Sequence, residues 1–168
     1  MKNIRNTIFE TNSSSVHAIC IAKDPIISFP GFVKFGRQMF GREEAEYYSI
    51  ESRASYLYEA ILAMDDEAVP NSHYYRDYYW SKVQDFLTKN GIRFEKDYSG
   101  PEYSQIDHGY ECEDFVREVC ENEDLLAMFL FGTRSKIQCG GDEQIPGKNK
   151  VQLMDEDTED YKVFIKGN

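Results

Sequence analysis

The sequence lacks any apolar run that approaches the ~20 residues needed to span a bilayer. Its basic start, Met1-Lys2-Asn3-Ile4-Arg5, is not followed by the apolar core of a signal peptide. Internal repeats and low-complexity tracts are also missing. We therefore expect one cytoplasmic domain covering residues 1–168, with no membrane partner.

Cysteine and histidine, the usual ligands of zinc, are scarce and poorly placed. The four cysteines match no ordinary disulfide framework, and in the cytoplasm they would be reduced thiols. The spacings His17-x2-Cys20 and His108-x3-Cys112 could belong to a zinc site. However, His17 and Cys20 point to opposite faces of any strand that they share. We expect no metal and no cofactor.

Basic residues are too few to suit a nucleic-acid-binding protein. The chain has 19 Lys and Arg against 30 Asp and Glu, so its net charge is -11. Residues 1–63 are neutral, with seven of each sign, whereas residues 64–168 hold twelve basic and twenty-three acidic side chains. Such a field repels DNA and RNA and attracts a basic partner.

Hydrophobic residues make up 41% of the chain and aromatic residues 14%, which is enough for a packed core. Strand patterns are followed by helix patterns and then by strand patterns again, so we predict an α+β fold: a mainly antiparallel sheet with about three helices packed on one face. The predicted strands are 4–9, 16–22, 32–36, 92–95, 135–139 and 161–165, with a further short strand at 151–153. The predicted helices are 50–64, 73–90 and a region from 110 to 131 that breaks at Asn122.

The second helix is rich in aromatic side chains. Its spacing turns Tyr75 and Tyr79 inward and places Tyr74, Tyr78 and Trp80 on the other face. That face either packs against the rest of the domain or forms an exposed docking patch.

A polar loop between the first two predicted strands is the densest group of potential ligands. It contains Asn12 and three serines, Ser13, Ser14 and Ser15, and it ends beside His17. An amide, three hydroxyls and an imidazole can hold a phosphate or carboxylate, or His17 can take a proton from a serine. Serine and asparagine are also ordinary turn residues, so a structural role stays open.

A second polar pair, Asp107-His108, lies in a later loop. If it meets His17 across the fold, then Ser14, His17, Asp107 and His108 would form a catalytic set, and Asn12, Ser13 and Ser15 would bind the ligand. Gly140-Gly141-Asp142 lacks the Lys and Ser/Thr of a phosphate loop and is interpreted as a turn.

The densest acidic run is Asp155-Glu156-Asp157-Thr158-Glu159-Asp160. It is either a solvated loop or a surface that mimics nucleic-acid phosphates. In the second interpretation Asp155, Glu156, Asp157, Glu159 and Asp160 contact the partner.

The stretch Arg5 to His17, with its Glu-Thr-Asn-Ser-Ser-Ser-Val-His core, resembles the amino-terminal signature of uncharacterised proteins from phages and prophages of low-GC Gram-positive bacteria. The resemblance extends to residues 54–58, 106–108, 129–132 and 135–142. Near the last segment such relatives have Thr-Gly-Asn-Asp, whereas this chain has Cys139-Gly140-Gly141-Asp142. The resemblance carries no known activity and implies an accessory protein of a mobile element in a bacterial host cell.

Two functions therefore stay open. The favoured one is an interaction protein without enzymatic activity: a phage-borne antagonist of a host nucleic-acid-targeting defence, of the anti-CRISPR type. It would bind the basic nucleic-acid-binding groove of a host protein, such as a Cas effector, as an acidic mimic. The alternative is a small enzyme or a nucleotide- or phosphate-binding protein that uses the serine loop, His17 and Asp107-His108.

Overall fold

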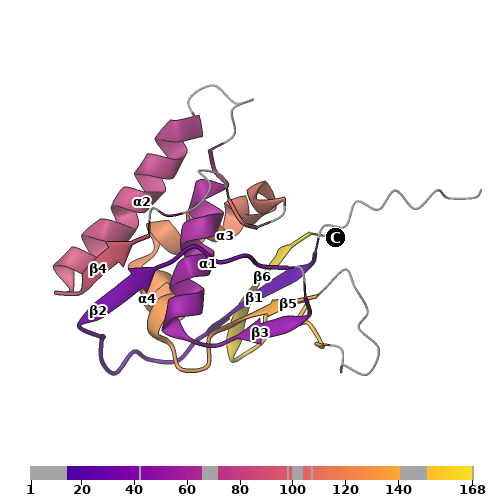
Figure 1. Cartoon of the computed structure of the whole chain (residues 1–168). Helices are drawn as coiled ribbons and strands as arrows, with labels where there is room; N and C mark the ends of the chain where they lie inside the picture. Colours follow the sequence, from indigo (N-terminus) through magenta and orange to yellow (C-terminus); the bar gives the residue numbers. More distant parts are fainter. Residues whose placement is uncertain are drawn as a thin grey trace, which may run out of the picture.

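The protein has an α+β architecture, as the sequence predicts (Figure 1). The computed structural model describes residues 15–41, 43–65, 72–97, 99, 104–106, 108–140 and 151–167. The predicted strand at residues 4–9 lies outside this part of the chain.

A four-stranded antiparallel sheet forms one side of the described structure, with the strand order β3-β5-β1-β6. Its strands are β1 (His17–Ala22), β3 (Ala45–Tyr47), β5 (Lys136–Cys139) and β6 (Tyr161–Lys166). All six residues of β1 are buried because this strand has a neighbour on each side and side chains packed on both faces. The sequence did not predict β3, and the segment 151–153 forms no strand.

Four α-helices and one 3-10 helix lie in the described part of the chain, where about three helices were expected. They are α1 (Ile50–Leu62), α2 (Ser72–Lys89), η1 (Gly109–Cys112), α3 (Glu113–Glu121) and α4 (Glu123–Phe131). The additional helix arises at Asn122, whose extended backbone ends α3 and whose side chain accepts hydrogen bonds from the first turn of α4. The predicted break is therefore confirmed.

Local signals set the ends of the two longer helices. The Ser49 hydroxyl accepts a hydrogen bond from the Ser52 amide at 3.0 Å, which caps α1. After α2 the chain turns at Gly91, whose φ of +68° suits glycine.

The two tyrosines of α2 that were predicted to point inward differ in burial. Tyr79 is buried as predicted, but Tyr75 is 50% exposed, so its predicted inward position is wrong.

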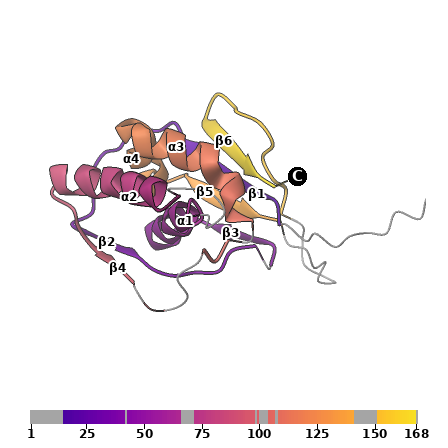
Figure 2. The same ribbon diagram turned by 90° about the horizontal axis from the view of Figure 1, so that it is seen from above.

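Strands β2 (Phe32–Phe35) and β4 (Arg93–Lys96) form a separate two-stranded parallel sheet. Figures 1 and 2 show α1 between this sheet and the four-stranded one. Trp80 of α2 packs edge-on against Phe35 and Phe94, so it is part of the core packing. Tyr74 stays 64% exposed.

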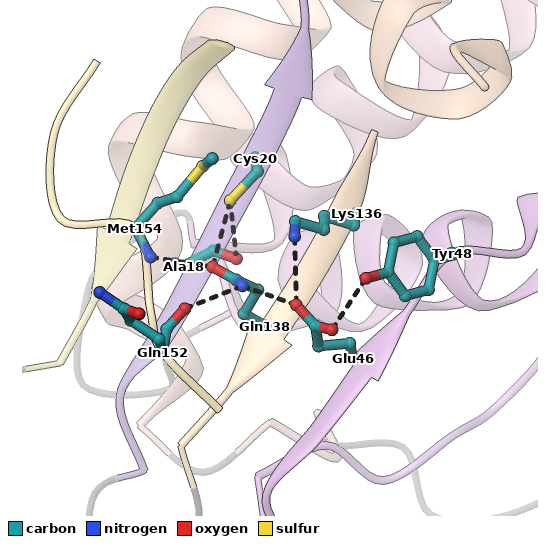
Figure 3. A network of polar contacts seen from close by, with 8 residues as sticks. All are labelled: Ala18, Cys20, Glu46, Tyr48, Lys136, Gln138, Gln152 and Met154. Atoms are coloured by element: carbon teal, nitrogen blue, oxygen red, sulfur yellow. Dashed lines mark hydrogen bonds and ion pairs between the residues drawn. The ribbon is translucent and has the colours of Figure 1, made fainter. Parts of the chain in front are cut away.

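The four-stranded sheet has two different faces. Its inner face carries His17, Ile19 and Ile21 toward the helices, and the two isoleucines join the main hydrophobic core. On the outer face Gln138 donates to Glu46 and to the Gln152 carbonyl and accepts from the Met154 amide (Figure 3). These bonds hold the segment around Met154 over Cys20, which explains why an outer-face thiol is buried.

Candidate functional site

His17 lies at the centre of a buried polar cluster where β1 begins. Its Nε2 atom is hydrogen bonded to the Ser15 hydroxyl at 2.7 Å, and its Nδ1 atom is hydrogen bonded to the Tyr56 hydroxyl at 2.8 Å. All three side chains are buried. Strand alternation turns His17 inward, and Tyr56 meets it from α1, which is buried on all sides over residues 53–61.

The neighbouring strands extend this cluster across the inner face of the sheet. His17 is paired with Cys139 of β5 on one side and with Lys166 of β6 on the other. The Lys166 ammonium group is completely buried and donates a hydrogen bond to the Ser15 carbonyl at 2.7 Å. The cluster thus joins the beginning of β1 to the end of β6.

Gly41 closes the cluster from the side. Its φ is +98°, and a Cβ atom built there would lie 1.9 Å from the Ser15 Oγ atom and 2.6 Å from the His17 Nε2 atom. Only glycine fits at this position, because the backbone itself packs against the hydrogen-bonded pair.

Burial determines the protonation of this cluster. It lowers the pKa of His17 to about 3, and the charge of Lys166 acts in the same direction, so the imidazole is neutral at pH 7. Burial likewise raises the pKa of Cys112 to about 11 and that of Cys139 to about 12. These thiols stay protonated, so neither is poised as a thiolate nucleophile.

The cluster contains some of the predicted site residues and not others. Ser15, which was predicted to bind the ligand, is hydrogen bonded to His17 of the predicted catalytic set, whereas His108 is hydrogen bonded to Tyr110 and not to His17. Asn12, Ser13, Ser14 and Asp107 lie outside the described residues. Within the described ranges, no three His, Cys, Asp or Glu side chains are grouped so that they could hold a metal ion.

Sequence reasoning missed Tyr56 and Lys166, although both carried a signal. Tyr56 lies within the best-predicted helix, where a buried hydroxyl needs a partner. Lys166 lies one residue past the last predicted strand, 161–165, and continuing the alternation of that strand would have turned it inward.

The predicted partner-binding run forms an exposed and ordered loop. All residues from 155 to 160 are exposed. The Lys23 amide donates to the Asp160 carbonyl at 2.8 Å, and the Lys23 ammonium donates to the Thr158 carbonyl at 2.7 Å. The loop is therefore fixed to the chain that follows β1.

Several carboxylates in the second half of the described chain have a basic neighbour. Glu118 is paired with Lys162, Glu123 with Lys89, and Asp160 is 3.7 Å from Arg134. Asp155, Glu156 and Glu159 have no ion-pair partner among the described residues. The unneutralised negative charge of this region thus includes the loop.

One acid of the loop has a structural role. Asp157 Oδ1 accepts a hydrogen bond at 2.7 Å from the amide of Val163, which points away from β1 on the edge strand β6. Next to it, the Tyr161 amide donates to the Thr158 hydroxyl. The loop thereby occupies backbone groups that another chain could otherwise pair with.

We expect Asp157→Ala to lower the free energy of unfolding by about 1 kcal/mol, because it leaves an amide of β6 without its acceptor. Asp157→Asn is the matched control, since it removes the charge and keeps an oxygen acceptor. Urea denaturation and light scattering would measure stability and self-association. Equal losses in the two variants would contradict a role for the hydrogen bond.

Comparisons with known protein families, with curated proteins and with solved structures found no match to this chain. In the described residues, no helix combines the length and apolarity needed to cross a membrane.

Proposed function

We propose that this protein antagonises a bacterial defence that targets nucleic acid, of the CRISPR type, by binding a basic surface of the effector protein. The proposal is supported by the net charge of -11, all of which arises in residues 64–168, and by the resemblance to phage and prophage proteins. Carboxylates would occupy the sites at which the effector binds nucleic-acid phosphates.

The observation that carries this proposal is the combination of order and exposure in the loop 155–160. Its backbone is fixed by hydrogen bonds, so little conformational entropy is lost when the loop binds. The carboxylates of Asp155, Glu156 and Glu159 are exposed to solvent and have no ion-pair partner among the described residues. Such charges accelerate association with a basic surface and lose strength as salt increases.

The triple variant Asp155→Asn/Glu156→Gln/Glu159→Gln is expected to weaken binding to a Cas nuclease about tenfold, because each exposed pair contributes up to about 1 kcal/mol. It spares Asp157, which caps the sheet edge. Pull-down and inhibition of DNA cleavage would be measured at low and high salt. The wild-type protein should bind more weakly as salt increases.

The control is the variant Asp85→Asn/Glu95→Gln/Asp124→Asn, which changes the net charge equally on three other exposed positions. It should bind nearly as well as the wild-type protein. Equal weakening by both triple variants would point to net charge alone, and unchanged inhibition by the loop variant would remove the acidic-mimic mechanism.

A second candidate function, acid–base catalysis on a small ligand, is favoured by one observation. The Ser15 hydroxyl lies 2.7 Å from His17 Nε2 while Tyr56 holds the other ring nitrogen, as in a nucleophile, base and orienting group. Against it, Ser15 is only 2% exposed. In the same inhibition assay, Ser15→Ala should leave an interaction protein active and should inactivate an enzyme.

A further inference from the structure

Strand β2 has one edge that no other strand of the described structure pairs with. In the parallel β2–β4 sheet the Arg93 amide donates to the Gly31 carbonyl at 3.1 Å, so the odd-numbered residues of β2 face β4 with their backbone groups. The backbone amide and carbonyl groups of Phe32 and Lys34 therefore face away from β4. They have no hydrogen-bond partner among the described residues.

This edge is open to solvent. Burial alternates along β2: Val33 and Phe35 belong to the hydrophobic core, whereas Phe32 is 46% exposed and Lys34 is also exposed. Figures 1 and 2 show β2 and β4 at the periphery of the molecule. An unpaired strand edge is a template for a further strand. The loop 155–160 occupies the outer edge of β6, but no described residue occupies that of β2.

The residues along this edge are complementary to themselves. If two β2 strands pair in antiparallel orientation around Val33, then Phe32 of each copy lies opposite Lys34 of the other, and four backbone hydrogen bonds form. The aromatic ring of one strand then contacts the lysine side chain of the other. A register shift sets either lysine opposite lysine or Lys34 opposite Pro30, which has no amide to donate.

Exposed apolar side chains flank β2 at both ends. Ile27, before the strand, is 97% exposed, and Met39, after it, is 46% exposed. Antiparallel pairing brings the segment before β2 of one copy toward the segment after β2 of the other. These side chains would then lose contact with water against the second copy, which favours association.

The distribution of charge also permits two copies to meet at β2. The net charge of -11 arises in residues 64–168, whereas β2 lies in the neutral stretch 1–63. The β2–β4 pair itself carries three basic side chains and one acidic side chain. An interface at β2 therefore avoids the repulsion that a contact between the acidic parts of two copies would cause.

We propose that two copies of this protein associate through β2 and form a continuous four-stranded sheet with the order β4-β2-β2-β4. The interface has two-fold symmetry, because each strand offers the same edge to the other. The additional strands also stabilise the sheet, since two strands alone are only marginally stable. The inference is independent of the proposed function, because it involves neither the loop 155–160 nor a nuclease.

The full chain should change from monomer to dimer as its concentration is raised, as measured by sedimentation velocity. Hydrogen exchange followed by NMR should show that the amides of Phe32 and Lys34 become protected as the dimer forms. The amides of Val33 and Phe35 face β4 and should be protected in both states. A chain that stays monomeric at every soluble concentration, or a dimer whose Phe32 and Lys34 amides exchange freely, would overturn the inference.

Lys34→Pro removes one outward amide and leaves the hydrogen bonds between β2 and β4 intact, since proline is tolerated on an open edge. It should weaken dimerisation about tenfold or more, because each copy loses a donor. Lys34→Thr is the matched control, since it keeps the amide, and it should weaken the dimer much less. Dimerisation of the proline variant at the wild-type concentration would contradict pairing through this edge.

Phe32→Lys tests the register at an exposed side chain, and it decides the matter if the proline variant does not fold. It sets lysines opposite each other across the two strands and should weaken the dimer. The double variant Phe32→Lys/Lys34→Glu replaces this repulsion by ion pairs and should recover much of the lost affinity. A double variant that dimerises as weakly as Phe32→Lys would refute the pairing of Phe32 with Lys34.

Discussion

Lowering the pH from 6.5 to about 3 is expected to destabilise this protein by roughly 4–5 kcal/mol through His17 alone. Burial lowers the pKa of His17 to about 3 in the folded state, whereas an unfolded chain has the usual value of 6.5. Between these values the unfolded state binds the proton and the folded state does not. Stability is therefore complete above pH 6.5 and is lost progressively as the pH falls.

The measurement is the free energy of unfolding from urea titrations at several pH values between 3 and 7. His17→Gln keeps a polar side chain that does not titrate, so its stability should fall less steeply with acid. His73→Gln is the control, because His73 is exposed on α2, and it should keep the steep dependence. Carboxylate protonation affects all three proteins alike. Parallel curves for His17→Gln and the wild-type protein would show that His17 does not cause the acid sensitivity.

Arg53→Ala is expected to lower the free energy of unfolding by about 4 kcal/mol. Arg53 is buried in α1, and its Nη1 atom donates to the carbonyls of Gly132 and Ser135. Both carbonyls belong to the turn after α4, where the negative end of the helix dipole favours a cation. Removing the side chain would leave two acceptors without a donor and a cavity beside them.

Arg53→Met separates these contributions, because it keeps most of the buried stem and removes the donors. We expect a loss of about 2 kcal/mol for this variant. Arg134→Ala removes an exposed arginine instead, and it should change stability much less. Thermal and denaturant unfolding would measure the stability of all three variants.

Burial lowers the pKa of Arg53 to about 10, so the guanidinium group is charged at pH 7 and its burial has a desolvation cost. A methionine variant as stable as the wild-type protein would mean that this cost outweighs the hydrogen bonds.

The sequence was sufficient for the elements whose signals are local. The position of α1 and the break at Asn122 depend on neighbouring residues, and both were predicted correctly. Strand β3 was missed because three residues are too few to show alternation. Its position is fixed by pairing with β5, which lies far along the chain.

The candidate site was predicted only in part because its members come from distant segments. The pairing of Ser15 with His17 could be anticipated from their closeness in sequence. The contact between His17 and Tyr56 depends on how α1 packs against the sheet, and the position of Lys166 depends on the register of β6. Tyr75 was placed inward by its spacing, but that position lies beyond the part of α2 that the core covers. Packing between elements decided each of these cases.

The order of the strands has a consequence for biosynthesis. β1 is the first described strand in the chain, yet its two neighbours, β5 and β6, are the last two. A ribosome would release the apolar β1 segment long before either neighbour exists, so the sheet can assemble only after β6 has been synthesised. Contacts between such distant segments slow folding, and they leave an aggregation-prone apolar strand exposed until its partner strands have been made. A chaperone that shields β1 during synthesis would therefore raise the yield of folded protein.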